Sequence, residues 1–450
     1  MTFKSINPAN GEVIASFEED ADYALKIRLG EKSFDRWKKT GIEERIKLIL
    51  NLAVILEARK AELAKEISLE MGKTLKSATA EIEKCAITAK YYCQIAEEQL
   101  GSIEVSNYAH KAYYKYEPQG GILAVMPWNF PYWQALRFAI PTILAGNVVL
   151  LKHAPNVFMS ATTLEKLFIE AGFENGIFQN LLVGIDKIES IVADPFIKGV
   201  TLTGSNLAGS SLASLAGKYL KKSVLELGGS DPFVVLADAN IENAATFAVK
   251  SRFQNAGQTC IAAKRWIVVD EVYEEFLNKV SEKINKLKAG DPFNTESDFG
   301  PVARLDLAEK IEGQINFLVK KGAKKLINGV RKGCLITPTL LNMNRDLSHS
   351  FTEELFGPVA CIIKAKNTDE AIEIANETNF GLGASLWSQN LEEGEHLLQK
   401  LNAGSVYLNS MVKSDASMPF GGINQSGYGR ELGVYGFYEF CNVKSYIIEK

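Results

Sequence analysis

The chain has 450 residues, of which 46% are hydrophobic and 23% are charged, and its formal net charge is −4. A chain of this length exceeds a single hydrophobic core, so two or three domains are expected. The composition is typical of a soluble globular protein. Acidic and basic residues are mixed along the chain, which excludes a nucleic-acid-binding stripe and a polybasic membrane patch.

Nothing in the sequence predicts secretion, membrane insertion or metal binding. Residues 1–5 lack the apolar core of a signal peptide, and no stretch approaches the length of a membrane span. The six cysteines contain no CxxC pair, which is typical of a reducing compartment, so we expect a cytoplasmic protein. The four histidines share no metal-ligand spacing.

Residues 41–100 are predicted to be helical, with a break at Gly72. One helical stripe is apolar and the opposite face is polar, which is the pattern of amphipathic helices. The apolar stripe comprises Ile42, Ile46, Ile49, Ala53, Leu56 and Leu63.

From about residue 120 onward, short β-rich runs alternate with helical segments, which predicts doubly wound, largely parallel sheets. The predicted strands span residues 121–126, 148–152, 199–203, 223–226, 232–236 and 265–269. The predicted helices span residues 160–171, 206–216, 241–254 and 273–287. We therefore expect two α/β domains that meet near residue 228.

Two further segments are predicted to be edge strands. Residues 103–118 alternate Val, Tyr and charged residues, and the tail 441–449 also has a strand-like composition. An exposed strand edge can pair with a strand of another subunit. These segments therefore predict an oligomerisation arm.

Cys260 is the most informative residue of the chain. It ends the run Gln254-Asn-Ala-Gly-Gln-Thr-Cys260, whose small and polar residues favour a loop. A lone cysteine is more often a small buried apolar residue, and Cys85, Cys93 and Cys361 have such settings. A thiol in a polar loop is instead placed for nucleophilic chemistry.

Glu226 and Asn129 complete a possible catalytic set with the thiol. Glu226 ends a predicted strand before Gly-Gly, where it would activate water, although a solvated strand end is an equally good interpretation. Asn129 lies within Pro127-Trp-Asn-Phe-Pro131, where its amide would stabilise an oxyanion by ~3 kcal/mol. A rigid aromatic turn is the alternative for Asn129.

The segment Thr203-Gly-Ser205 leaves a predicted strand and opens a helix. Backbone N–H groups at such a point attract phosphate, but Ser205 or Asn206 would also be an ordinary helix cap. No GxGxxG fingerprint occurs, and Gly72-Lys-Thr74 is not a P-loop because Ile67 replaces the required glycine.

Taken together, the motifs resemble those of the aldehyde dehydrogenase superfamily from Asn7-Pro-Ala-Asn-Gly-Glu12 to the C-terminal strand. The matching motifs, in chain order, are PWNFP at 127–131, LKHAPN at 151–156, TGS at 203–205, ELGG at 226–229, QNAGQTC at 254–260, EELFGP at 353–358 and MPFGGINQSGYGREL at 418–432. One such motif alone would be weak evidence of this resemblance, but the whole set in this order is specific for the superfamily.

The resemblance implies a role for each matched residue. Cys260 is similar to the family nucleophile, Glu226 to the general base, and Asn129 to the oxyanion donor that works with the backbone N–H of Cys260. The residues implied in cofactor binding are Trp128, Lys152, Pro155, Gly204, Ser205, Leu227, Glu354 and Phe356. The family fold implies a dinucleotide-binding domain at 1–102 and 119–228, a catalytic domain at 229–425, and an oligomerisation arm at 103–118 and 434–450. In the family this arm builds dimers or tetramers, so the resemblance implies a homodimer or homotetramer.

The cofactor segment departs from many NAD-using members of the superfamily. Pro155 stands where they carry a glutamate that binds the ribose hydroxyls. Without this carboxylate a 2′-phosphate is not repelled, so NADP is favoured over NAD, with Lys152 and His153 as candidate phosphate ligands. Ala262 stands where some relatives carry a second cysteine, so no local disulfide is expected.

The segment 151–156 is similar to a bacterial succinate-semialdehyde dehydrogenase branch. Arg137 matches the position of an arginine that binds the substrate carboxylate there, although a structural helix arginine is an equally good interpretation. Ser414, Lys264 and Arg265 are further candidates. A distal carboxylate would pair well with Arg137, which favours succinate semialdehyde.

Three other functions stay open at this point. In the first, the protein oxidises another small aliphatic or amino aldehyde. In the second, it is a cofactor-independent thiol esterase. In the third, it is a non-catalytic nucleotide-binding scaffold. The scaffold is disfavoured because it requires none of Cys260, Glu226 and Asn129.

Overall fold

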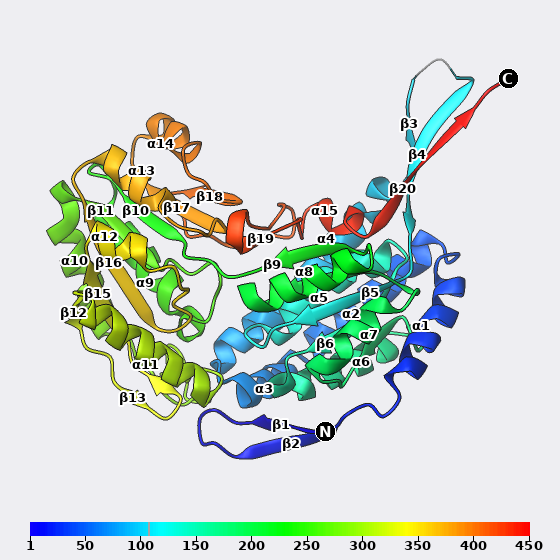
Figure 1. Ribbon diagram of the computed structural model, residues 1–450, viewed down its shortest axis with the longest axis horizontal. Helices are drawn as coiled ribbons and strands as arrows, with labels where there is room; N and C mark the ends of the chain where they lie inside the picture. The colour runs from blue at the N-terminus through cyan, green and yellow to red at the C-terminus, as the bar shows by residue number, and fades with distance from the viewer. Residues whose placement is uncertain (107–108) are drawn as a thin grey trace.

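The computed structural model describes residues 1–106 and 109–450 and shows two α/β bodies with a projecting β arm (Figure 1). The first body is built on a six-stranded sheet of order β19-β9-β8-β5-β6-β7. Its strands are β5 (Gly121–Met126), β6 (Val148–His153), β7 (Phe178–Asn180), β8 (Ile197–Thr203), β9 (Lys222–Glu226) and the antiparallel β19 (Gly427–Tyr428).

The five parallel strands of this sheet are placed on both sides of β5, which lies in the middle. The chain passes from β5 to β6 and β7, then returns to β8 on the other side of β5 and continues to β9. Because parallel crossovers are right-handed, helices α5 (Pro131–Leu144) and α6 (Phe158–Glu170) cover one face and α8 (Asn206–Lys218) the other. The topological switch point lies between β5 and β8, where α/β sheets bind ligands at the carboxyl ends of their strands.

The predicted helical segment 41–100 forms three helices outside α5. These are α2 (Ile42–Ala58), α3 (Lys60–Met71) and α4 (Leu75–Gln99). Gly72 ends α3 with a φ of 81°, in the left-handed region that favours glycine. A Cβ at this position would lie only 2.8 Å from the Pro8 ring. The other helices of this body are α1 (Tyr23–Trp37), α7 (Ile188–Ala193) and α15 (Tyr435–Tyr438), and the hairpin β1 (Thr2–Ile6) and β2 (Val13–Glu18) precedes them.

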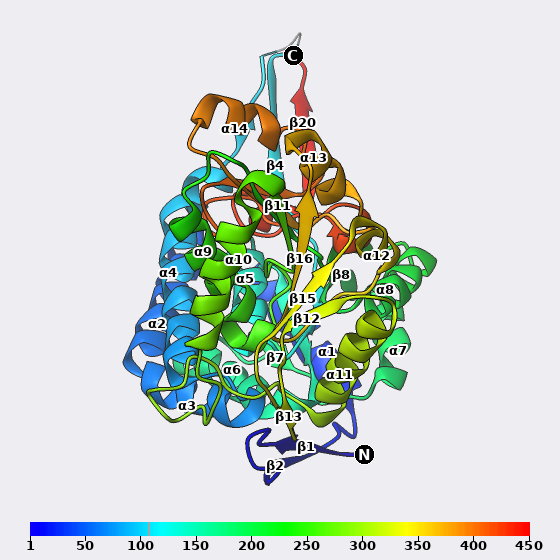
Figure 2. The same cartoon turned by 90° about the vertical axis from the view of Figure 1, so that its left-hand side faces the viewer.

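The second body is built on a seven-stranded sheet of order β12-β15-β16-β11-β10-β17-β18 and lies in front of the first body in the view of Figure 2. Its strands are β10 (Pro232–Val235), β11 (Arg265–Val269), β12 (Lys324–Ile327), β15 (Thr339–Met343), β16 (Val359–Ala365), β17 (Gly383–Trp387) and β18 (Ser405–Leu408). Its helices are α9 (Ile241–Phe253), α10 (Asp270–Asn285), α11 (Leu305–Lys320), α12 (Arg345–Ser350), α13 (Thr368–Asn376) and α14 (Leu391–Leu398). Separate cores lie in the two bodies. The first core contains buried apolar residues from Phe3 to Leu227, together with a few from later segments such as Phe437 and Phe440, and the second contains those from Phe233 to Leu401.

The α/β fold class predicted from the alternation of strands and helices is confirmed, and the predicted strands are displaced by at most two residues at their ends. The two predicted edge segments pair with each other. Strand β20 (Cys441–Ile448) lies antiparallel to β4 (Lys111–Pro118), and β3 (Ile103–Glu104) lies on the other side of β4. Residues 107 and 108 of the predicted arm segment lie outside the described residues.

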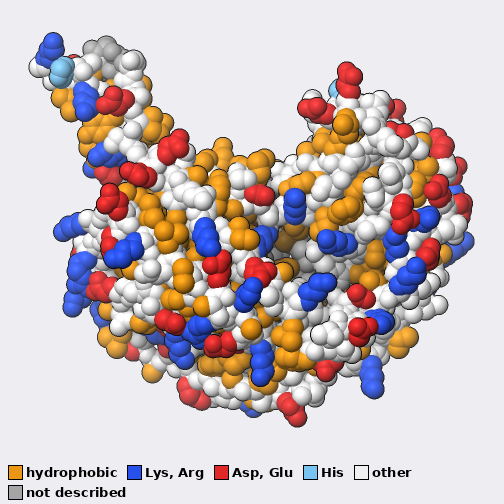
Figure 3. Space-filling model, turned by 180° about the vertical axis from the view of Figure 1, so that it is seen from behind, with side chains coloured by type: hydrophobic (Ala, Val, Ile, Leu, Met, Phe, Trp, Pro, Cys, Tyr) orange, Lys and Arg blue, Asp and Glu red, His pale blue; other side chains and the backbone are white. Residues whose placement is uncertain are grey.

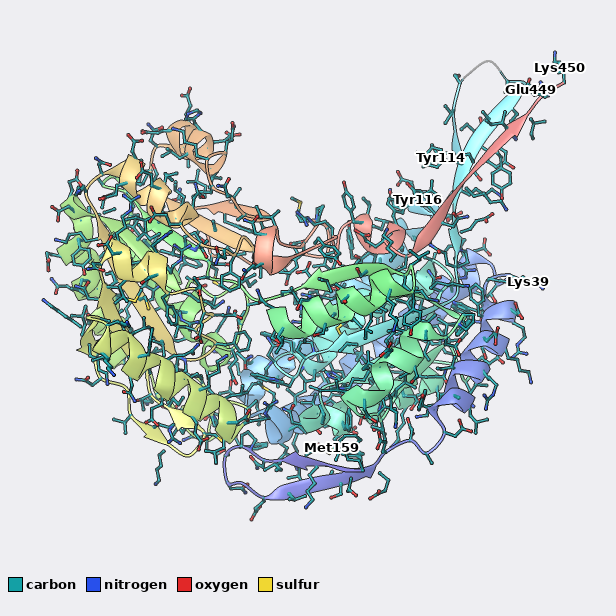
Figure 4. All side chains as sticks on the ribbon, in the orientation of Figure 1. Lys39, Tyr114, Tyr116, Met159, Glu449 and Lys450 are labelled. Carbon is teal, nitrogen blue, oxygen red and sulfur yellow. The ribbon has the colours of Figure 1, made fainter. Side chains whose placement is uncertain are left out.

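The arm stands clear of the body in the rear view of Figure 3, where acidic and basic side chains are interspersed over the surface. Tyr114 and Tyr116 project from it in Figure 4. Stacked tyrosine pairs stiffen the arm: the rings of Tyr113 and Tyr446 lie 4.6 Å apart, and those of Tyr116 and Tyr438 lie 3.9 Å apart. Within the described parts of the chain, no helix is both long enough and apolar enough to span a bilayer.

Candidate active site

A cleft of about 640 Å³ opens at the switch point between β5 and β8. Trp128 and Asn129 reach it from the turn after β5, and Gly204 and Ser205 from the turn after β8. Of the sequence-predicted residues, the cleft is bordered by Trp128, Asn129, Gly204, Ser205, Leu227, Cys260, Glu354 and Phe356. The first five come from one body and the last three from the other, so the cleft lies between the bodies.

A second cavity of about 230 Å³ meets the first at Cys260 and Gln134. It is lined by aromatic and aliphatic side chains of Phe130, Trp133, Ile261, Met411 and Phe420. Arg137 and Ser414, the predicted substrate residues, also border it. The thiol therefore lies where a large cleft and a small, mainly apolar cavity join.

The loop before Cys260 has an unusual backbone. Asn255, Ala256 and Gly257 have successive φ angles of 53°, 53° and 73°, all in the left-handed region. Such a conformation costs free energy at the two non-glycine residues and is retained only where the surroundings fix it. Side-chain hydrogen bonds do so here: Asn255 donates to the backbone oxygen of Asn129 (3.0 Å), and Asn129 Nδ2 donates to the backbone oxygen of Gln258 (3.0 Å).

Arg252 holds the cysteine loop against the loop that carries Glu354 and Phe356. Its guanidinium is fully buried and donates to the backbone oxygens of Gly257 (3.3 Å) and Leu355 (2.8 Å). It also donates to the oxygens of Val359 and Gly357. No sequence motif indicated a role for Arg252, because a basic residue near a helix end is normally solvated.

The thiol of Cys260 is half-buried, and burial raises its pKa to about 12. Lys264 opposes this effect, but its Nζ is occupied: it donates to the backbone oxygen of Cys260 (2.5 Å) and pairs with Glu354 (2.9 Å). Lys264 borders neither cavity that contains Cys260, so its interpretation as a substrate ligand is wrong. Arg265 is also wrong as a substrate ligand, because it donates to the backbone oxygens of Ser230, Ile374 and Ala375.

Glu226 is buried and borders neither cavity. Neither of its carboxyl oxygens has a hydrogen-bond partner among the described residues, and Oε1 faces Gly421. Burial, with a smaller contribution from Glu431, raises the pKa of Glu226 well above its usual value. In this conformation the carboxyl group is buried outside both cavities that contain Cys260, and burial favours its neutral form.

Lys152 lies at the end of β6, beside β5, and is 6% exposed. No carboxylate among the described residues pairs with it, and burial lowers its pKa. Pro155 is exposed and begins the short helix η1 (Pro155–Val157). Neither residue borders the 640 Å³ cleft, although both lie at the same carboxyl edge of the sheet.

His153 is wrong as a phosphate ligand. Its Nε2 donates to the backbone oxygen of Pro131 (2.9 Å), and its Nδ1 accepts the N–H of Ala154 (2.9 Å). Burial lowers its pKa to about 4, so the ring is neutral and both of its nitrogens are used by the backbone.

Arg137 borders the smaller cavity but is only 2% exposed. Its Nε lies 2.5 Å from the carboxylate of Glu431, and a terminal nitrogen donates to Thr203 Oγ1 (3.3 Å). Its charge is therefore already balanced by a buried acid. Ser414 accepts a hydrogen bond from Lys84 (2.5 Å), a residue that the sequence analysis did not single out.

Glu354 and Phe356 approach the cleft from the second body. Glu354 Oε1 accepts the backbone N–H of Gly229 (3.2 Å), and the ring of Phe356 meets Trp128 edge-on at 5.8 Å. A Cβ at Gly228 would lie 2.6 Å from Glu354 Oε2, so a larger residue there would displace this carboxylate. Within residues 1–106 and 109–450, no three His, Cys, Asp or Glu side chains gather as metal ligands.

The model of the aldehyde dehydrogenase family matches residues 1–446. The chain belongs to this family, which confirms the resemblance and the predicted class of NAD(P)-dependent oxidoreductase.

Similar proteins include a probable succinate-semialdehyde dehydrogenase [NADP(+)] of Synechocystis sp., 43% identical over 450 residues, with 99% of each chain covered. Succinate-semialdehyde dehydrogenase [NADP(+)] 1 of Mycobacterium tuberculosis is 42% identical over 459 residues, again with 99% of each chain covered. Among solved structures, succinic semialdehyde dehydrogenase of Streptococcus pyogenes, in complex with NADP+, superposes with a TM-score of 0.96 at 35% identity over the whole of both chains.

Proposed function

We propose that this protein oxidises succinate semialdehyde to succinate with NADP+ as hydride acceptor. The observation that carries the proposal is the position of Cys260, at the junction of a dinucleotide-sized cleft and a small cavity with basic side chains. The named activities of the Synechocystis, Mycobacterium tuberculosis and Streptococcus pyogenes proteins support the same substrate and cofactor.

The residues of the cleft, together with Lys152 at the same carboxyl edge of the sheet, fit a bound NADP. Lys152 is a buried ammonium without a carboxylate partner, as expected of a group that meets an anionic ligand. Glu354 and Phe356 would hold the nicotinamide end, while Gly204 and Ser205 would hold the pyrophosphate. When bound, the oxidised nicotinamide supplies the hydride acceptor.

The first chemical step is assigned to Cys260 and Asn129. The Sγ–H proton of Cys260 passes to solvent in the open cleft, Sγ bonds to the aldehyde carbon, and the electron pair of the C=O bond moves to the carbonyl oxygen, which becomes an oxyanion. Asn129 and the backbone N–H of Cys260 would donate to that oxygen. One N–H of the Asn129 amide already donates to Gln258, which fixes the amide and leaves its second N–H free for the oxyanion.

Once the carbon on Sγ has given up its hydride, the adduct is a thioester. Glu226 then takes a proton from water, the water oxygen bonds to the thioester carbon, and the C–S bond breaks to release the acid and the thiolate. Because Glu226 borders neither cavity, its side chain must rotate toward Cys260 for this step.

The experiment is an aldehyde panel with both cofactors. Purified protein is mixed with succinate semialdehyde, butanal or betaine aldehyde and with NADP or NAD, and reduced nicotinamide is followed by its absorbance. The highest kcat/KM is expected with succinate semialdehyde and NADP. If no aldehyde supports reduction of NADP or NAD, the proposal is wrong. A preference for an uncharged aldehyde would show that succinate semialdehyde is not the substrate.

Replacement of Lys152 by methionine is expected to weaken NADP binding by about 10- to 100-fold, because a charged hydrogen bond to phosphate is lost. Fluorescence titration with NADPH measures the change. Lys166→Met is the matched control, because Lys166 is exposed on α6. Equal NADPH binding by Lys152→Met and the native protein would show that Lys152 does not contact the cofactor.

We also propose that residues 1–102 and 119–228 bind the cofactor, that residues 229–425 carry catalysis, and that residues 103–118 and 434–450 mediate oligomerisation. The arm supports a homodimer or homotetramer because β20 is an outer strand whose Val443 and Ile447 are 57% and 55% exposed. Light scattering of the full chain is expected to give the mass of two or four copies, and a monomer at micromolar concentration would contradict it. We further propose a cytoplasmic location, because all six cysteines are free thiols.

A further inference from the structure

We propose that Lys84, with Ser414, forms the subsite that binds the distal carboxylate of the substrate and so selects acidic aldehydes. The inference deepens the proposed function and rests on it. It assigns the charge recognition to α4, a helix on which sequence motifs place no site residue.

One face of α4 forms a wall of the 230 Å³ cavity. Ser77, Ala80, Glu81 and Lys84 recur at helical spacing along this face and border the cavity with Cys260. Lys84 Nζ donates to Ser414 Oγ (2.5 Å) and lies 4.0 Å from the centre of the Trp133 ring. The hydroxyl and the aromatic face hold the ammonium in one position.

Lys84 differs from Arg137 in its charge balance. The guanidinium of Arg137 is paired with the buried carboxylate of Glu431 at 2.5 Å. In contrast, no carboxylate oxygen of the described residues lies within 4.0 Å of Lys84 Nζ. Burial, followed by repulsion from Arg137, lowers the pKa of Lys84 to about 8, so the ammonium form predominates at neutral pH.

The acids nearest to Lys84 in sequence or space are engaged elsewhere. Glu81 forms a fully buried pair with Lys73 (2.5 Å) and accepts the backbone N–H groups of Tyr132 and Trp133 at the start of α5. Asp415, next to Ser414, is exposed and accepts hydrogen bonds from Ser417. The ammonium of Lys84 is therefore a cation whose partner would be supplied by the ligand.

The walls of the cavity strengthen an ion pair at Lys84, and the size of the cavity restricts the length of the substrate. Trp133, Ile261 and Phe420 form apolar walls that lower the local dielectric, so an ion pair inside is stronger than in bulk solvent. The cavity is much smaller than the cleft on the other side of Cys260. A short aldehyde with a terminal carboxylate matches both the charge of Lys84 and the volume of the cavity.

The test compares two aldehydes of the same chain length, succinate semialdehyde and butanal, in Lys84→Met, Lys84→Arg and Lys90→Met. Lys90 is the matched control, because it lies on α4 and pairs with Glu57. In Lys84→Met the ratio of kcat/KM for succinate semialdehyde to that for butanal is expected to fall about 10- to 100-fold, mainly through KM. Lys84→Arg is expected to restore part of the ratio, and Lys90→Met to keep it.

A ratio unchanged in Lys84→Met would overturn the inference, as would an equal loss with both aldehydes, which indicates a structural role. Calorimetric binding of succinate separates this outcome from failure of the proposed function. If the native protein turns over no aldehyde, weaker succinate binding by Lys84→Met still supports the subsite. Equal binding by the two proteins, or no binding by either, overturns it.

Discussion

Replacement of Cys260 by alanine is expected to lower kcat by at least about 10⁴-fold, because the covalent route needs the sulfur and removal of a nucleophile is not compensated by its neighbours. Of the six cysteines, only Cys260 borders the cleft and the smaller cavity. Steady-state reduction of NADP with succinate semialdehyde measures the loss, and NADPH fluorescence checks that the cofactor still binds.

Cys334→Ala is the matched control, since Cys334 is also half-buried but lies in a separate cavity beside Arg304 and Leu335. Its activity is expected to equal that of the native protein. Retention of more than a tenth of the native rate in Cys260→Ala would contradict the covalent mechanism.

The same thiol gives a pH dependence that can be measured without substrate. Burial raises the pKa of Cys260 to about 12, so the neutral thiol predominates at pH 7 and the thiolate fraction rises about tenfold for each pH unit below that pKa. Alkylation of Cys260 by iodoacetamide, followed by peptide mass spectrometry, is expected to be about 100-fold faster at pH 9 than at pH 7. A rate independent of pH would show that the free protein holds a thiolate.

Glu226→Gln is expected to stop the reaction after its first half. Acylation of Cys260 continues, but water is no longer activated, so each site reduces one NADP in a burst and steady-state kcat falls about 10²- to 10⁴-fold. Rapid mixing measures the burst, and mass spectrometry of the intact protein detects the succinyl thioester. An exposed acid, Glu189, supplies the control Glu189→Gln, which is expected to turn over normally.

The buried position of Glu226 sets the direction of the accompanying pH effect. Its pKa is raised above its usual value, chiefly by burial, so the base form appears only as the pH rises through that higher pKa. The rate of thioester hydrolysis in the native protein is expected to increase with pH over this range. Loss of the burst together with loss of turnover in Glu226→Gln would place Glu226 in acylation and contradict its role as the base of hydrolysis.

Much of the fold was predictable because each strand or loop depends on residues that are adjacent in the sequence. Strand β5 spans 121–126 as predicted, because an apolar run bounded by Gly121 and Pro127 has one favourable structure. The loop before Cys260 was predictable for a related reason: Asn and Gly are the residues that tolerate left-handed backbone, and two of its three left-handed positions are occupied by Asn255 and Gly257.

The charged residues were harder to predict, because their partners are distant in sequence. Arg137 was predicted as a substrate ligand, and it does border the cavity, but Glu431 neutralises it. Lys264 and Arg265 follow Cys260 closely in the chain, yet both turn away from the cavity toward backbone oxygens and Glu354. Sequence proximity to a nucleophile therefore did not predict proximity to the substrate.

The amino-acid order alone determined the class of chemistry, since a thiol in a polar loop, a glutamate before Gly-Gly and an asparagine between prolines each depend on a few adjacent residues. Only the tertiary structure decided which cations face the ligand. Packing of α4 against α5 brings Lys84 to Trp133, and the segment after β18 brings Ser414 to Lys84. The strand β19 is followed by Glu431, which pairs with Arg137. The physical reason is that a buried charge is governed by the groups within a few ångströms of it, and these come from segments that the linear sequence keeps far apart.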